Sequence, residues 1–112
     1  MTNFTAILKD ESRLAKALAE IGLTERQKET LVSLAGYPNG IEARRDEGNR
    51  VRGEGIYACS MIGSALTKHL GCDGPIDKMM WIGTLHQDDA GGERWVIRPE
   101  VRSALKSLNW IS

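Results

Sequence analysis

The chain is poor in the residues that mark specialised classes of small protein. It holds only two cysteines, three prolines, three tryptophans, two tyrosines and one phenylalanine. Cys59 and Cys72 have no further cysteine or histidine at zinc-finger spacing, so the sequence indicates neither a disulfide framework nor a structural metal site. The simplest interpretation is two reduced thiols, and no cofactor is expected.

An excess of charge of either sign is also missing. The 15 Lys and Arg residues balance the 15 Asp and Glu residues, so the formal net charge is zero. A protein that neutralises many phosphates normally carries a visible basic excess. A DNA-binding surface would therefore have to be assembled in three dimensions from separate segments.

Long apolar runs are absent as well. No stretch approaches the roughly 18 apolar residues of a membrane span, and the N-terminus lacks the pattern of a signal peptide. We therefore expect a cytoplasmic location and no membrane partner. With 112 residues, 41% of them hydrophobic and 27% charged, the chain is long enough for one globular domain and too short for two.

The first third of the chain favours helices. Apolar residues recur at helical spacing from Asn3 to Ile21, and Asp10 could cap a fresh start inside this segment. One bent helix and two short helices fit this pattern equally well. Next, Thr24-Glu25-Arg26-Gln27 has the capping-box pattern, which predicts a new helix that ends near Ala35.

Residues 41–55 are densely charged and offer little to a core. This segment is interpreted as surface, with either a short helix over Glu42–Glu47 or a mobile loop. Residues 56–71 favour another helix, in which Ser60 is a candidate N-cap and Gly71 a candidate stop.

The last third favours a hairpin and a final helix. Lys78–His86 and Glu93–Arg98 are short β-like runs around a glycine-rich reversal. Pro99 then suits the first position of a helix. Trp110 and Ile111 are expected to cover the edge of the core.

This order of elements resembles a winged helix-turn-helix module. The run Leu23–Leu34 looks like the Leu-Thr-x-x-Gln opening helix of MarR-type and phage-type modules. Residues 60–71 fall where such modules carry the recognition helix, and Met79–Ile97 where they carry the wing. The resemblance covers about residues 23–108.

The resemblance implies an α+β fold in a single compact unit. It would be a mainly helical, winged-helix-like domain over residues 23–112, with a C-terminal β-hairpin followed by a helix. Residues 1–22 would be an N-terminal helical extension.

Such modules are small regulators of transcription that bind double-stranded DNA. The helix after Ser60 would enter the major groove, and basic side chains would hold the phosphates. The candidate DNA-binding residues are Arg44, Arg45, Arg50, Arg52, Ser60, Ser64, Thr67, Lys68 and Arg94.

A protein-binding module or inhibitor on the same scaffold is the alternative. Small neutral proteins of this type occur among phage and mobile-element products, including inhibitors of host complexes. Tyr37, Tyr57, Trp81 and Trp110 are candidate anchors for a partner, although burial is the simpler role for a tryptophan in an aromatic-poor core.

The remaining two hypotheses concern catalysis and the formation of a homodimer. No carboxylate pair, Ser/His/Asp set, metal triad or phosphate loop stands out, so we expect no enzyme and no catalytic residue. Winged-helix regulators often act as twofold dimers. Phe4, Ile7 and Leu8 are the candidates to supply spare apolar surface for a homodimer.

Overall fold

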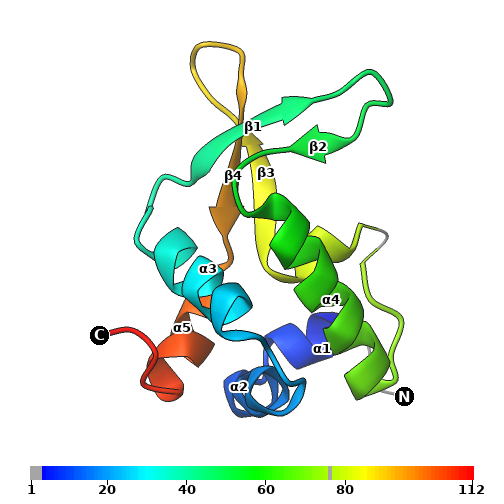
Figure 1. Ribbon diagram of the computed structural model, residues 1–112, viewed down its shortest axis with the longest axis vertical. Coiled ribbons are helices and arrows are strands. Elements are labelled where there is room, and N and C mark those ends of the chain that lie inside the picture. Colours follow the sequence, from blue (N-terminus) through cyan, green and yellow to red (C-terminus); the bar gives the residue numbers. More distant parts are fainter. Residues whose placement is uncertain (1–3, 76) are drawn as a thin grey trace.

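The computed structural model describes residues 4–75 and 77–112, which form helices and a four-stranded antiparallel sheet. The predicted α+β class is therefore confirmed. The helices gather at one end, and two β-hairpins project from the other (Figure 1). In chain order the elements are α1 (Phe4–Leu8), α2 (Glu11–Glu20), α3 (Glu25–Ala35), β1 (Ile41–Arg45), β2 (Val51–Arg52), α4 (Ile56–Leu70), the 3₁₀ turn η1 (Lys78–Trp81), β3 (Gly83–Gln87), β4 (Glu93–Ile97) and α5 (Pro99–Ser107).

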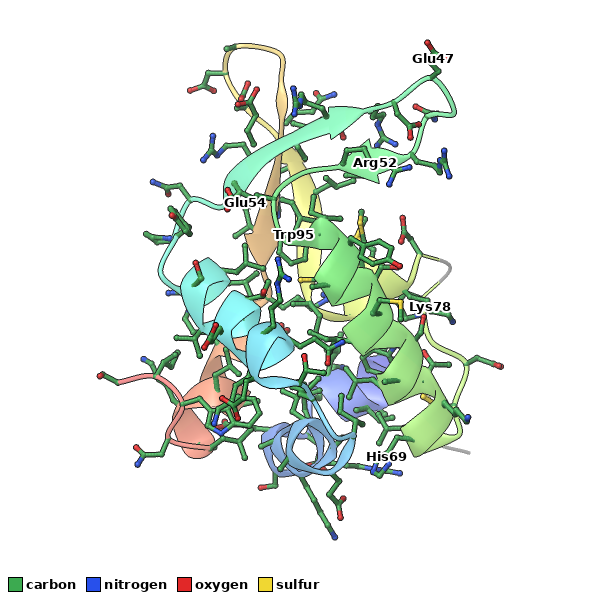
Figure 2. The ribbon with its side chains drawn as sticks, in the orientation of Figure 1. Glu47, Arg52, Glu54, His69, Lys78 and Trp95 are labelled. Carbon is green, nitrogen blue, oxygen red and sulfur yellow. The ribbon has the colours of Figure 1, made fainter. Side chains whose placement is uncertain are left out.

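The two hairpins share one sheet in the strand order β2-β1-β4-β3. β1 joins them by pairing with β4, where Ile41 lies opposite Trp95. Because successive side chains of a strand point to opposite faces, Ala43, Trp95 and Ile97 share the face that is buried against the helices. Figure 2 shows Trp95 inside the fold and Glu47 at the outer tip of the β1–β2 hairpin.

The N-terminal segment forms two helices rather than one bent helix. The Asp10 side chain accepts a hydrogen bond of 3.1 Å from the Arg13 N–H, and this cap starts α2. Ile7 and Leu8 are buried in the same core as the rest of the chain. Phe4 packs edge-on against Trp81, with the ring centroids 4.5 Å apart. The spare apolar surface predicted for α1 is therefore wrong, while a homodimer as such stays a prediction.

The capping box of α3 is confirmed. The Thr24 hydroxyl accepts from the Gln27 N–H at 3.1 Å, and the Gln27 side chain accepts from the Thr24 N–H at 3.0 Å. The helix ends at Ala35, as its sequence predicts. This cap satisfies two amides that the first helical turn leaves unpaired, so it fixes where α3 begins.

The helix α4 begins before the position that the sequence suggested. Its N-cap is Gly55, at φ 83°, so Ser60 lies inside the helix and its prediction as N-cap is wrong. Burial of Ile56 explains the earlier start, because the first helical residue already packs into the core. The predicted stop at Gly71 is confirmed: its φ is 60°, and its N–H donates to the Thr67 carbonyl.

A close contact joins α4 to η1. A Cβ at Gly63 would collide with the carbonyl oxygen of Lys78, so only glycine allows this approach. Next to it, the Trp81 indole N–H donates to the Thr67 hydroxyl at 2.8 Å. The buried Trp81 thereby ties the segment before β3 to α4.

Two other predictions for local structure are wrong. Residues 41–45 form β1, not a helix over Glu42–Glu47 or a mobile loop, because this segment pairs with β4 and buries Ala43. The run Lys78–His86 is not one strand either. Asp77 accepts from the Met79 N–H at 3.3 Å and caps η1, so β3 begins only at Gly83.

The C-terminal part follows the prediction. Pro99 occupies the first turn of α5, where its missing N–H costs no helical hydrogen bond. Trp110 and Ile111 are partly buried and pack on the core. Lys28 of α3 lies 4.7 Å from the centre of the Trp110 ring, so the chain end is held to α3 by a cation–π contact as well.

Candidate functional site

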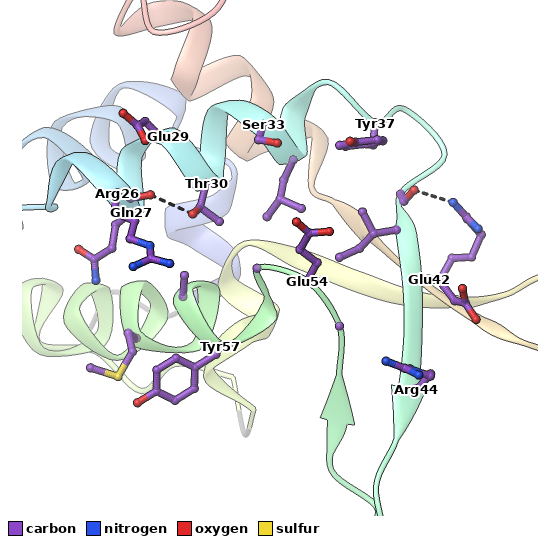
Figure 3. A pocket seen from close by; sticks show the side chains of 18 of the residues that line it. Arg26, Gln27, Glu29, Thr30, Ser33, Tyr37, Glu42, Arg44, Glu54 and Tyr57 are labelled. Atoms are coloured by element: carbon purple, nitrogen blue, oxygen red, sulfur yellow. Dashed lines mark hydrogen bonds between the residues drawn. The ribbon is translucent and has the colours of Figure 1, made fainter.

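A groove of about 1150 Å³ opens between α3, α4 and β1. Figure 3 shows α3 along one wall, α4 along the other and β1 closing one end. We call it the α3–α4 groove. It is lined by Thr24, Arg26, Gln27, Glu29, Thr30, Ser33, Leu34, Tyr37, Gly40, Ile41, Glu42, Arg44, Gly53, Glu54, Gly55, Tyr57, Ala58, Met61 and Arg94.

The exposed large apolar side chains of the described residues all line this groove. They are Tyr37 at 52% exposure, Tyr57 at 74% and Met61 at 50%. Single exposed apolar residues are normal on a protein surface, but a gathering of them around one hollow is typical of an interaction site. The α3–α4 groove is therefore the candidate site.

The helical pattern explains why Tyr57 and Met61 face outward. Cys59, Ile62 and Leu66 occupy the buried face of α4. Tyr57 and Met61 are four residues apart, so they lie together on the exposed face. The exposed face continues with Ser64 and Lys68, beyond the groove.

The floor of the groove depends on a close approach of α3 to the start of α4. The Thr30 hydroxyl donates to the Arg26 carbonyl at 2.9 Å, and the Thr30 methyl faces Gly55: a Cβ at Gly55 would lie 3.1 Å from it. The same Cβ would lie 3.4 Å from a Leu34 methyl. Since Gly55 also has a positive φ, this position favours glycine twice over.

Arg94 holds the rim of the groove at the end of α3. Its guanidinium donates to the carbonyl oxygens of Asn39 at 2.8 Å and Gly40 at 2.7 Å. The Gly40 N–H donates in turn to the Tyr37 carbonyl at 2.9 Å. Arg94 was predicted to bind DNA phosphates, and here it orders the loop that carries Tyr37.

Charges of both signs surround the apolar side chains. Within the described residues, no ion pair or hydrogen bond reaches the charged ends of Arg26, Glu29, Glu42, Arg44 and Glu54. Side chains of this kind remain available to a partner. The mixture of signs also means that the groove is not a basic channel.

Three more of the predicted arginines, all on the β1–β2 hairpin, are paired with carboxylates. The Arg45 guanidinium donates to both carboxylate oxygens of Glu93, at 2.7 and 3.1 Å, and this bond raises the pKa of Arg45. Arg50 and Arg52 lie 3.3 and 2.9 Å from the same oxygen of Asp46. The backbone N–H of Arg50, followed by the Arg52 side chain, lowers the pKa of Asp46 below its usual value.

The predicted DNA-contacting face of α4 is only partly present. Ser64 and Lys68 are exposed and Ser60 is half-buried. Thr67 instead faces inward, where its hydroxyl donates to the Gly63 carbonyl at 3.1 Å and accepts from Trp81. Its prediction as an outward-facing donor is wrong, because the indole N–H of Trp81 needs a partner inside the fold.

Three other kinds of site would point to a different function: a metal site, a reactive cysteine and a membrane-spanning helix. The described residues contain no group of three or more His, Cys, Asp or Glu side chains placed to hold a metal ion. Burial raises the pKa of the Cys59 thiol to about 12, so it stays protonated at neutral pH. Nor, in ranges 4–75 and 77–112, does any helix have the length and apolar character to cross a membrane.

Sequence reasoning found part of this site. Tyr37 and Tyr57 are predicted anchors that the structure brings to one groove, whereas Trp81 is buried and Trp110 partly so. Met61 and Glu54 were missed. The four-residue spacing of Met61 from Tyr57 was a usable signal, but the position of Glu54 depends on how β2 meets α4.

The chain is a small α+β domain with an open groove, in which exposed apolar side chains stand among charges of both signs. No protein-family model, no curated protein and no solved structure matches the chain. The winged-helix resemblance therefore stays a prediction, and function has to be inferred from the groove.

Proposed function

We propose that this chain is a protein-binding module, without catalytic activity, that receives a segment of another protein in the α3–α4 groove. The observation that carries the proposal is the gathering of Tyr37, Tyr57 and Met61 around one hollow. Aromatic residues and methionine are enriched at the centres of protein interfaces. The unpaired charges of the groove supply the polar rim that such a centre needs.

The pairing of the predicted arginines and the apolar start of α4 argue against DNA as the first choice. Phosphate binding needs free cations, yet three of the five predicted arginines, Arg45, Arg50 and Arg52, are paired with carboxylates. The helix that would enter the major groove presents Tyr57 and Met61 over its first half. The cytoplasmic location inferred from the sequence stays a prediction.

Site-specific photo-crosslinking tests the proposal. A benzoylphenylalanine at Tyr57 keeps an aromatic ring in the groove, and the same group at Lys106, exposed on α5, serves as the matched control. In the cells that naturally contain the protein, we expect a covalent adduct with another protein from position 57 only. Met61→Ser should abolish that adduct, because it removes apolar surface beside the probe without touching the core.

Other outcomes would overturn the proposal. Equal adducts from both positions would show non-specific contact. An adduct of twice the chain's own mass would show self-association through the groove. A DNA adduct, with saturable binding of a random duplex that weakens between about 50 and 200 mM salt, would restore the DNA-binding hypothesis.

A further inference from the structure

We infer that the α3–α4 groove selects a partner segment that places a lysine or arginine side chain beside Glu54. This inference rests on the proposed function and specifies the chemistry of the partner.

The position of Glu54 places its carboxylate between the two walls of the groove. It stands between the end of β2 and the start of α4, and Figure 3 shows its carboxylate pointing into the space between α3 and β1. In that view Tyr37 lies on one side of it and Tyr57 on the other. Within the described residues the carboxylate has no ion-pair or hydrogen-bond partner.

The turn around Glu54 offers the groove this side chain alone. A Cβ at Gly53 would lie 2.7 Å from a methyl of Ile56 and 3.0 Å from the Glu42 carbonyl oxygen. On the other side, Gly55 has a φ of 83°. Both neighbours are thus positions that suit glycine, so Glu54 is the one residue of this turn that presents a side chain to the groove.

The cations of the chain leave this carboxylate unneutralised. Arg94 is committed to the carbonyl oxygens of Asn39 and Gly40. Figure 3 shows Arg26 reaching from α3 at one end of the groove and Arg44 on β1 at the other, with Glu54 between them. The exposed carboxylate of Glu54 is therefore available to a cation of a partner, and the faces of the tyrosine rings attract the same kind of charge.

Peptide titration followed by amide NMR tests the inference on the full chain. The probes are the capped pentapeptide Ala-Leu-Arg-Leu-Ala and its counterpart with glutamine in place of arginine. We expect saturable shifts at Tyr37, Glu54 and Tyr57. The arginine peptide should bind about two- to fivefold more tightly, the ratio typical of an exposed ion pair.

Two variants, each of which removes one charge from the groove, decide whether Glu54 is responsible. Glu54→Gln should remove the preference for the arginine peptide, whereas Arg26→Gln removes a cation from the same groove and should leave the preference intact or increase it. Both side chains are exposed, so neither change disturbs the core.

The remaining outcomes separate the two proposals. If both peptides bind the groove equally, or if Glu54→Gln keeps the preference, charge selection by Glu54 is wrong while protein binding at the groove stands. If neither peptide shifts the groove resonances, the inference about Glu54 fails, and the crosslink at position 57 alone decides the protein-binding function.

Discussion

The two β-hairpins close with the same five-residue turn, at Asp46–Arg50 and at Asp88–Gly92. In each, the first residue donates its N–H to the carbonyl of the fifth, at 3.0 and 2.9 Å. In each, the aspartate carboxylate accepts from the N–H groups of the third and fifth residues, at 2.8 to 3.0 Å. The fourth residue has a positive φ in both, Asn49 in one and Gly91 in the other.

The strands behind these turns differ. β3 and β4 pair over five residues, with Trp95 and Ile97 buried in the core. β1 and β2 pair over two residues; Asp46 forms ion pairs with Arg50 and Arg52 across this short hairpin, and Arg45 ties β1 to Glu93 of β4. The same turn therefore closes one hairpin held by packing and one held by charge, and the charged hairpin is the one beside the groove.

The largest effect should come from the packed hairpin. Trp95→Ala removes a side chain that is 1% exposed and should lower the free energy of unfolding by about 3–5 kcal/mol. A smaller truncation in the other hairpin, Val51→Ala, should cost about 1 kcal/mol because it removes only two methyl groups and Val51 is only partly buried. Urea unfolding of both variants measures the difference. Equal losses would mean that the two hairpins contribute alike to the core.

Replacing the aspartate of each turn should affect the two hairpins to different extents. Asp46→Ala removes the turn hydrogen bonds and also the partner of Arg50 and Arg52. Asp88→Ala removes hydrogen bonds alone, in a hairpin that Trp95 still anchors. Hydrogen exchange should accelerate along the whole β1–β2 hairpin in the first variant and only within the turn in the second. The same local response in both would refute a charge-held hairpin.

Acid should act on the charged hairpin with a definite sign. The Arg50 N–H and the Arg52 guanidinium hold the pKa of Asp46 below its usual 3.8. The folded pKa is the lower one, so this carboxylate stabilises the hairpin fully above pH 3.8 and loses its effect as the pH falls through the folded value. Carboxyl carbon shifts recorded during acidification should report this titration. Titration of Asp46 above its usual pKa would contradict the contacts described for it.

The contrast between hairpins also shows which local structure the sequence could predict. Signals confined to a few neighbouring residues worked: the Thr24–Gln27 capping box, the Gly71 stop and Pro99 at the start of α5 are all present. The segment 41–55 was misinterpreted because its strand depends on a distant partner. Trp95 lies 54 positions from Ile41, and no local pattern in a charged segment announces that pairing.

The site was harder to predict than the fold. The sequence shows that Arg45 and Arg52 are basic, but it does not show that Glu93 and Asp46 neutralise them. Likewise Thr67 is polar in the sequence and proves to be the inward partner of Trp81. Whether a basic side chain is free to bind a phosphate depends on its partners in the folded molecule. Counting the basic residues of a sequence therefore overestimates how many of them can contact DNA.

The smallest predicted effect concerns the fourth turn position, where the two hairpins use different residues for one backbone conformation. Gly91 has a φ of 83°, and a Cβ there would meet nothing within 4 Å, so any penalty comes from the backbone alone. Gly91→Ala should lower the free energy of unfolding by about 1 kcal/mol. Gly91→Asn should lower it by only a few tenths of a kcal/mol, because asparagine tolerates the left-handed region, as Asn49 does at φ 60°. Asn49→Gly should be nearly neutral. The urea midpoints of all three variants, at unchanged slope of the unfolding curve, measure these losses. If Gly91→Ala unfolds at the same midpoint as the unchanged protein, the two turns do not share this conformation.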